Sequence, residues 1–150
     1  MKRILLIFAW LVCFAITAMA QAKYVFFFIG DGMGPNQVLA AEMYQAALKG
    51  EIGRVPLLMS QFPYSGQAAT FSASYGITDS AAAGTCLATG KKTNNGMIGQ
   101  TPDGELAISV ASQLKTEGWG VGIMSSVPVD HATPASHYAH AEKRYYYYKI

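Results

Sequence analysis

The sequence predicts an α/β fold with a parallel-sheet core and helices on both faces. Two apolar runs, at 24–29 and 119–124, are bounded by glycine and are typical of strands buried on both faces of a parallel sheet. Segments in which apolar residues recur at helical spacing separate these runs. The alternation of the two patterns indicates a sheet covered by helices, because each apolar face needs a partner layer.

The first α/β unit is predicted between residues 24 and 50. The run Tyr24–Ile29 ends at Gly30, as a buried strand would. Pro35 suits the first turn of a helix, because the amide hydrogen that proline lacks has no acceptor there. Apolar residues then recur at helical spacing up to Gly50: Val38, Leu39, Met43, Ala46 and Ala47. A strand, a glycine loop and a helix therefore open the fold.

Residues 65–71 are predicted to form a second strand, and the small-residue run over 79–88 a helix. Thr78 or Asp79 would cap the start of this helix, because short polar side chains accept hydrogen bonds from the first free amides. Gly90 would end it, because glycine readily takes the left-handed conformation found after helices.

The segment 91–104 holds two turn signals that end in glycine, so it is predicted to be a loop over the surface. A helix is predicted over 106–114, before the strand at 119–124. A last helix is predicted with Thr133 as its cap and Pro134 at its first position.

The first twenty residues have the pattern of a cleaved export signal. Two basic residues precede an apolar stretch over 4–16, and Ala18-Met19-Ala20 supplies the small-x-small pattern of a cleavage site. The stretch is shorter than the roughly 20 residues of a spanning helix, so no permanent membrane span is expected. We therefore expect a signal peptide at 1–20, a mature domain at 21–150, and a periplasmic or secreted protein.

The charge of the chain argues against nucleic acid as a partner. The formal net charge is +2, and loss of Lys2 and Arg3 with the leader leaves 9 basic against 9 acidic residues. Binding to nucleic acid requires a concentrated basic surface that displaces counterions. No such surface is indicated.

A carboxylate flanked by glycines follows the first predicted strand, in Gly30-Asp31-Gly32-Met33-Gly34. Open α/β sheets bind ligands at this end of their strands, and glycines let the backbone approach an ion closely. Asp31 is therefore a candidate metal ligand. An ordinary turn in which Asp31 caps the next helix explains this motif alone equally well.

Ser80 stands at the predicted start of the helix over 79–88, among residues too small to block a substrate. Free backbone amides and the helix dipole favour a phosphate dianion there, and an adjacent metal would favour the attacking alkoxide. Ser80 is therefore a candidate nucleophile. The alternative is that Asp79 and Ser80 merely cap a tightly packed helix.

Two other hydrolase motifs are excluded by spacing. A P-loop would need glycine where Thr85 stands and a hydroxyl residue where Lys92 stands. The elbow Gly-x-Ser-x-Gly of serine esterases would need glycine in place of Thr78 and Ala82.

The segment after residue 128 contains three histidines and an arginine. His137 and His140 lie three residues apart on the last predicted helix with no obvious third ligand, so solvated or core roles are favoured over zinc binding. Arg144 could clamp two phosphate oxygens, although an arginine after a helix is more often a surface charge.

Taken together, these segments resemble the alkaline phosphatase family. Three blocks carry the resemblance, in the order and spacing of that family: Gly30–Gly34, Asp79-Ser80 with its small residues, and the segment from His131 to Arg144. They extend over nearly all of the chain after residue 20. Each block is ambiguous alone, whereas their combination is specific.

The resemblance implies roles for the metal and phosphate residues. Asp31 would bridge one zinc and the magnesium, and Thr133 would ligate the magnesium. Ser80 would form a phosphoserine, while Arg144 would hold two phosphate oxygens with the assistance of Asp79. One further position, His131, lies where the family varies between Asp and His, and it would support the magnesium site without ligating it.

The implied reaction is hydrolysis of phosphate monoesters by two in-line displacements, with zinc and magnesium as cofactors. The resemblance leaves a homodimer open for a full-length form. Family members are much longer, and the chain stops without a turn or capping signal, so a fold truncated at its C-terminus and an inactive fragment are expected.

Two alternatives remain open at this point. One is a short non-catalytic protein that binds phosphate or a partner through the helix start at Ser80 and through Arg144. The other is a different metallo-hydrolase of the same superfamily, such as a phosphodiesterase or sulfatase. Ser80 and its alanine run favour a monoesterase, because those relatives usually carry Thr or a modified Cys there.

Overall fold

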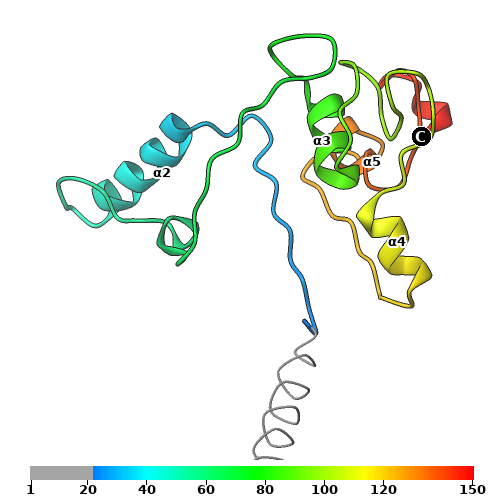
Figure 1. Ribbon diagram of the computed structural model, residues 1–150. Helices are drawn as coiled ribbons and strands as arrows, with labels where there is room; N and C mark the ends of the chain where they lie inside the picture. The colour runs from blue at the N-terminus through cyan, green and yellow to red at the C-terminus, as the bar shows by residue number, and fades with distance from the viewer. Residues whose placement is uncertain (1–21) are drawn as a thin grey trace, which may run out of the picture. The chain divides into compact units, whose positions relative to one another are not determined.

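A computed structural model describes residues 22–150, so the predicted signal peptide at 1–20 lies outside the described residues. The described chain contains four α-helices and two short 3₁₀ helices (Figure 1). These elements are α2 (Pro35–Leu48), η1 (Leu58–Gln61), α3 (Ser80–Thr89), α4 (Val110–Thr116), α5 (Ala132–Ala135) and η2 (Tyr147–Lys149). No helix in the described range has the length and apolar character needed to cross a bilayer.

The predicted parallel sheet is not confirmed in residues 22–150. The segments predicted as strands, at 24–29, 65–71 and 119–124, are not in strands, and β pairing is limited to two isolated antiparallel bridges. A parallel strand depends on hydrogen bonds to distant neighbours and on cover over both faces. The apolar pattern of these segments is therefore present without the partners that would make them strands.

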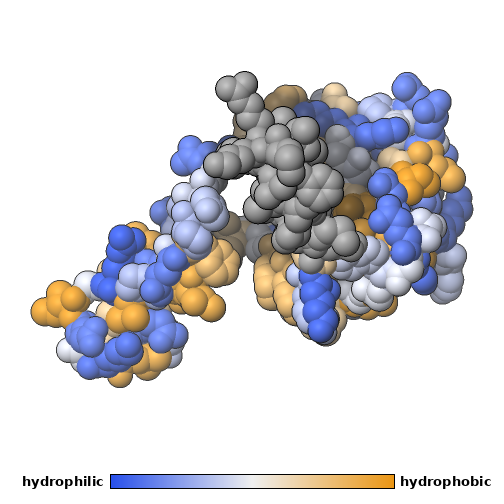
Figure 2. Space-filling view, turned by 60° about the horizontal axis from the view of Figure 1, so that its bottom comes forward, coloured by the Kyte–Doolittle hydropathy of each residue, from blue (hydrophilic) through white to orange (hydrophobic). Residues whose placement is uncertain are grey.

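The side chains of these segments are largely exposed. In the unit that ends at Gly30, Phe26 is 78% and Phe28 86% exposed. Phe71 and Met124, in the second unit, are also open to solvent. Figure 2 shows apolar residues, in orange, lying among polar ones on the face that it presents.

Helix α2 confirms the predicted helix after Gly34, but its apolar face is not buried as expected. Leu39 and Met43 are about half exposed, whereas Glu42 is fully buried. The Glu42 carboxylate accepts hydrogen bonds from Ser60 Oγ (2.6 Å) and the Leu57 amide (3.1 Å), and it pairs with Arg54 (3.3 Å). A polar clamp therefore attaches residues 54–60 to α2.

Helix α3 is the predicted helix of small residues, and its two caps explain its length. Asp79 Oδ1 accepts a hydrogen bond from the Ala82 amide at 2.9 Å, which makes Asp79 the N-cap, one of the two residues proposed for it. Gly90 ends the helix with φ of 72°, in the left-handed region, as predicted.

Helix α4 begins later than predicted. The expected helix over 106–114 starts only at Val110, because Ser109 caps it and the preceding residues form other contacts. Leu106 bridges to Gln100, and the Ala107 amide donates to the Gly99 carbonyl at 2.9 Å. These contacts use backbone groups that a longer helix would need.

Helix α5 is a single turn, and its predicted cap is wrong by two residues. The N-cap is His131, so Thr133 and Pro134 both lie inside the first turn. Proline is tolerated at any first-turn position, because those amides lack an intrahelical acceptor. The helix ends at Ala135, so His137 and His140 lie after it and not on it.

A small core forms where α3 contacts α5 and α4. Its buried residues are nearly all alanines, with one larger side chain: Ala81, Ala132, Ala135, Ala139, Ala141 and Ile98. Ile98 is bridged to Ala141 and comes from the segment 91–104. The prediction that this whole segment runs over the surface is therefore wrong at Thr93 and Ile98, both fully buried.

Candidate functional site

Ser80 lies at the first position of α3, directly after the capping residue. Its hydroxyl is partly exposed, and Asp79 Oδ1 accepts a hydrogen bond only from the third helical amide, that of Ala82. The amides of Ser80 and Ala81 have no acceptor among the residues that the structure describes. These amides and the positive end of the helix dipole make the start of α3 suited to an anion.

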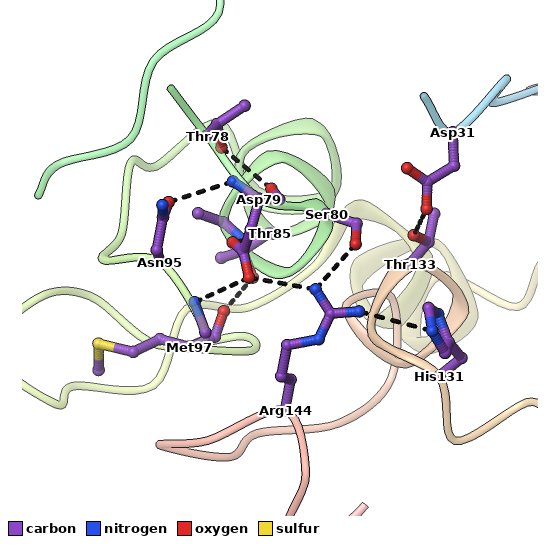
Figure 3. A network of polar contacts seen from close by, with 12 residues as sticks. Asp31, Thr78, Asp79, Ser80, Thr85, Asn95, Met97, His131, Thr133 and Arg144 are labelled. Atoms are coloured by element: carbon purple, nitrogen blue, oxygen red, sulfur yellow. Dashed lines mark hydrogen bonds and ion pairs between the residues drawn. The ribbon is translucent and has the colours of Figure 1, made fainter. Parts of the chain in front are cut away.

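Arg144 contacts the start of α3 from a position 64 residues later in the chain. Its Nη1 donates to Ser80 Oγ at 2.9 Å and to Asp79 Oδ2 at 3.2 Å (Figure 3). The ion pair is partly exposed, with side-chain exposures of 29% for Arg144 and 25% for Asp79. The guanidinium therefore lies directly at the candidate nucleophile, as the phosphate role requires.

His131 lies beside the same guanidinium. Its Nε2 is 3.5 Å from Arg144 Nη2, at the upper limit of a hydrogen bond. Because arginine only donates, this contact is favourable only when Nε2 carries no proton. His131 is therefore in position to orient Arg144.

Asp31 and Thr133 form a second pair of site residues. Thr133 Oγ1 donates to Asp31 Oδ2 at 2.8 Å, across 102 residues of sequence. Figure 3 shows this pair next to the Ser80–Arg144–His131 group, with Thr133 and His131 both contributed by the start of α5. The six predicted site residues thus form two neighbouring sets of polar contacts. One set is Asp79, Ser80, His131 and Arg144, and the other is Asp31 and Thr133.

Close packing of α3 against α5 holds the two halves of this arrangement together. At Gly84 a side-chain Cβ would lie 2.7 Å from Ser136 Oγ and 3.5 Å from Thr133 Cα. Ser136 is buried, and its hydroxyl donates to the Thr133 carbonyl at 2.8 Å. The absence of a side chain at Gly84 therefore lets α5 approach the helix that carries Ser80.

Tyr138 supports the turn that leads into α5. Its hydroxyl donates to the Val129 carbonyl at 2.7 Å. Burial, with a smaller contribution from the charge of Asp130, raises the pKa of Tyr138 above its ordinary value of 10.0. The phenol therefore keeps its proton, and with it this hydrogen bond, across the neutral and mildly alkaline range.

The other two histidines contact the backbone. His140 Nδ1 is 2.5 Å from the Gly99 carbonyl, and His137 Nδ1 is 3.2 Å from the Thr133 carbonyl. Residues 22–150 contain no group of three or more His, Cys, Asp or Glu arranged to hold a metal ion. Asp31 and Thr133 would therefore provide only part of a ligand set.

Asn95 is a residue of the network that the sequence did not reveal. Its side chain forms hydrogen bonds with the Ile77 carbonyl and the Asp79 amide, on the backbone that leads to Ser80. In the sequence it was visible only as part of a turn signal, and nothing in that signal distinguishes a turn that contacts a site from one on the surface.

A serine at a helix start, an arginine on its oxygen and a neighbouring pair of hard oxygen donors together make a centre suited to phosphoryl transfer. The family model for alkaline phosphatase matches residues 22–150. The chain belongs to the alkaline phosphatase family.

Individual relatives agree with this family. The chain is 36% identical over 137 residues to the tissue-nonspecific alkaline phosphatase of Gallus gallus, and 32% identical over 138 residues to the alkaline phosphatase of Gadus morhua. These alignments cover 84% and 85% of this chain but 26% and 29% of the relatives. The chain thus spans less than a third of the length of these relatives.

Solved structures show the same similarity in three dimensions. The cold-active alkaline phosphatase of Shewanella sp. gives a TM-score of 0.71 at 32% identity, covering 79% of this chain and 30% of that one. The Thermus thermophilus alkaline phosphatase gives 0.71 at 28% identity, covering 80% and 25%. A mutant alkaline phosphatase from the Antarctic bacterium TAB5, described with Mg bound in its M3 site, gives 0.51 at 28%, covering 59% and 29%. The aligned part of the chain, about four fifths of it in two of these comparisons, therefore has the fold of the corresponding part of an alkaline phosphatase.

Proposed function

We propose that the chain provides the phosphate-binding and nucleophilic half of a metal-dependent phosphate monoester hydrolase. The observation that carries this proposal is the contact of Arg144 Nη1 with Ser80 Oγ at 2.9 Å, at the start of α3. Membership of the alkaline phosphatase family supports the same function. Phosphate monoesters are accordingly the proposed substrates.

The residues of the site would act in two displacements. In the first, Ser80 Oγ forms a bond to phosphorus, the ester P–O bond breaks, and the alcohol leaves with the proton that the serine gives up. In the second, water attacks the phosphoserine and releases inorganic phosphate, which restores the hydroxyl. Arg144 and the free amides at Ser80 and Ala81 hold the phosphoryl oxygens in both steps.

Asp79 and His131 prepare the arginine for this task. Asp79 Oδ2 accepts from Nη1 and His131 Nε2 contacts Nη2, so the guanidinium is held before a phosphate arrives. Holding a charged group in place in advance lowers the reorganisation needed when the phosphoryl group binds.

The donors at Asp31 and Thr133 fit part of a magnesium site, because two oxygens 2.8 Å apart are the ligand type that magnesium prefers. We propose that both residues hold magnesium and that Asp31 also contacts a zinc. Bound there, the cations would favour the alkoxide form of the serine and offset charge on the phosphoryl group. A catalytic zinc takes about three protein ligands, and residues 22–150 contain no group of three or more His, Cys, Asp or Glu that could hold one. We therefore propose that residues 1–150 alone can form the phosphoserine but turn substrate over little or not at all.

Trapping the phosphorylated serine tests the function. The chain is incubated with radiolabelled inorganic phosphate in the presence of zinc and magnesium, quenched in acid, and digested for mass spectrometry. Label on the peptide that contains Ser80, lost in Ser80→Ala and kept in the exposed-serine control Ser65→Ala, is the expected result. Label that persists in Ser80→Ala would overturn the assignment of the nucleophile.

A non-catalytic phosphate-binding protein is the second candidate, favoured because no three or more His, Cys, Asp or Glu residues are grouped to hold a metal ion within residues 22–150. It predicts phosphate binding that depends on Arg144 but no labelled serine, even when both metals are added. The trapping experiment and a phosphate titration, taken together, therefore distinguish the two functions.

We also propose that the protein is exported, on the basis of the leader pattern at 1–20. N-terminal sequencing of protein recovered from the periplasm or medium should give a first residue of Gln21. An intact Met1 on that protein would contradict cleavage.

A further inference from the structure

The turn at Asn94–Met97 contacts both the segment that carries the candidate nucleophile and the segment that carries Arg144. Asn95 Oδ1 accepts a hydrogen bond from the Asp79 amide at 3.2 Å, and Asn95 Nδ2 donates to the Ile77 carbonyl at 3.1 Å. One side chain thus satisfies a donor and an acceptor on the backbone that leads into α3; Figure 3 shows its contact with Asp79. The N-cap residue of α3 is therefore fixed by its main chain as well as by its carboxylate.

The same turn also holds the arginine. The Gly96 amide donates to Asp79 Oδ2 at 3.0 Å, and the Gly96 carbonyl accepts from the Arg144 amide at 2.7 Å. Gly96 has φ of 86°, a conformation that favours glycine. Two consecutive residues, Asn95 and Gly96, therefore connect the main chain of Arg144 with that of Asp79.

Asn95 is itself held in place, so it can act as a fixed support. Its main-chain amide donates to Ser74 Oγ at 3.0 Å. Ser74 Oγ in turn lies 3.4 Å from the hydroxyl oxygen of Ser72, a buried residue. The neighbouring Asn94 differs in this respect, because its side chain has no hydrogen bond to any residue within 22–150. The two adjacent asparagines therefore form a natural pair for comparison.

We propose that Asn95 is a positioning residue for phosphate binding. It touches neither Ser80 nor the guanidinium, but it fixes the Asp79 backbone, and Asp79 in turn orients Arg144. Without Asn95 the Asp79 amide and the Ile77 carbonyl lose their partners, and the start of α3 becomes free to shift relative to Arg144. Small displacements of this kind are costly at a site that binds by preorganisation.

This inference rests on the proposed function, since it concerns affinity for phosphate. The test is calorimetric titration of inorganic phosphate into the full chain and three variants: Asn95→Ala, Asn94→Ala and Arg144→Ala. Asn95→Ala is expected to weaken binding about three- to tenfold, the equivalent of one hydrogen bond, while Asn94→Ala stays within about twofold of the wild type. Arg144→Ala is expected to weaken it most.

A second measurement separates positioning from general destabilisation. In the absence of phosphate, the NMR signal of the Arg144 side chain should move in Asn95→Ala and stay in place in Asn94→Ala, although Asn95 does not touch that side chain. If Asn95→Ala does not fold, Asn95→Asp and Asn94→Asp replace the pair. Each adds one negative charge, but only Asn95→Asp removes the donor to Ile77.

The outcomes distinguish the positioning role of Asn95 from the proposed function on which it rests. Phosphate binding that depends on Arg144 but is unchanged in Asn95→Ala would overturn the positioning role and leave the proposed function standing. Phosphate binding that is absent, or equal in Arg144→Ala and the wild type, would overturn the phosphate site and the inference with it.

Discussion

Two regions of this molecule carry equally clear apolar signals in the sequence, yet only one of them is packed. The α3 cluster, which we define as α3, α5, residues 93–101 and Arg144, has fully buried side chains at Ile98, Thr85 and Thr93. The predicted strands at 24–29 and 119–124 leave most of their large apolar side chains exposed, and none of those side chains is fully buried. The cluster also contains the candidate nucleophile and its arginine.

The difference teaches which interactions each region needs. In the α3 cluster, caps, tight turns and contacts between small residues are completed within the described residues. A parallel strand instead requires a neighbour on each side and helices on each face. Substitutions in the two regions should therefore differ sharply in their effect on stability.

Truncation of the one large core side chain of the α3 cluster should lower the stability of the fold most. Ile98→Ala is expected to lower the free energy of unfolding by about 2–5 kcal/mol, because Ile98 is fully buried. The matched control is Ile52→Ala, at a fully exposed isoleucine, with an expected change within about 0.5 kcal/mol. Urea unfolding followed by circular dichroism measures both. Equal effects would mean that the contrast between the regions is wrong.

Adding a methyl group between α3 and α5 should give a somewhat smaller loss of stability. Gly84→Ala brings a Cβ to 2.7 Å from Ser136 Oγ and 3.3 Å from Ser136 Cβ, so overpacking of about 1–3 kcal/mol is expected. Gly122→Ala, where nothing lies within 4 Å, serves as the control. Combining Gly84→Ala with Ser136→Ala should recover part of the loss in a double-mutant cycle. Additive effects of the two substitutions would refute this cause.

Glu42 gives a pH-dependent test outside the α3 cluster. Hydrogen bonds from the Ser60 hydroxyl and then from the Leu57 amide lower the pKa of Glu42 below its ordinary value of 4.5. The carboxylate therefore stabilises the fold above about pH 4.5, and that contribution is lost as the pH falls through the lowered value.

The variant Glu42→Gln lacks this titration. Its free energy of unfolding should be lower than that of the wild type at neutral pH, and the difference should shrink as the pH falls below 4.5. Thermal unfolding at a series of pH values provides the measurement. A difference that grows on acidification would have the wrong sign for this account.

The smallest effect is expected in the exposed apolar run. Phe26→Ala removes a large aromatic side chain that is 78% exposed, so the free energy of unfolding should change by less than about 0.5 kcal/mol. Solubility should rise, because exposed apolar area favours association. A loss comparable to that of Ile98→Ala would show that this run is packed in solution.

Local signals in the sequence were sufficient for helices α2 and α3. Pro35 and Gly50 predicted α2, and Asp79 with Gly90 predicted α3, because caps act within one turn. The sequence could not supply the partners of a sheet, which lie far away along the chain. It also misplaced the cap of α5, since proline is tolerated at several first-turn positions.

The candidate site was predicted largely from residue types and from the resemblance to a family. The structure brings Arg144 to Ser80 and Asp31 to Thr133, but the roles of these residues in catalysis stay predictions. Asn95 and Glu42 were not foreseen, because a buried polar residue is recognised only by its partners, and those partners come from elsewhere in the chain.

The central claim is that the start of α3 and Arg144 bind a phosphoryl group, and a phosphate titration followed by NMR tests it most directly. The amide signals of Ser80 and Ala81 should shift and saturate. Arg144→Ala should weaken binding by about 1.5–3 kcal/mol, whereas Lys143→Ala, which removes the same charge from an exposed neighbour, should change it little. Saturating shifts confined to other residues, or equal losses in the two variants, would contradict the claim.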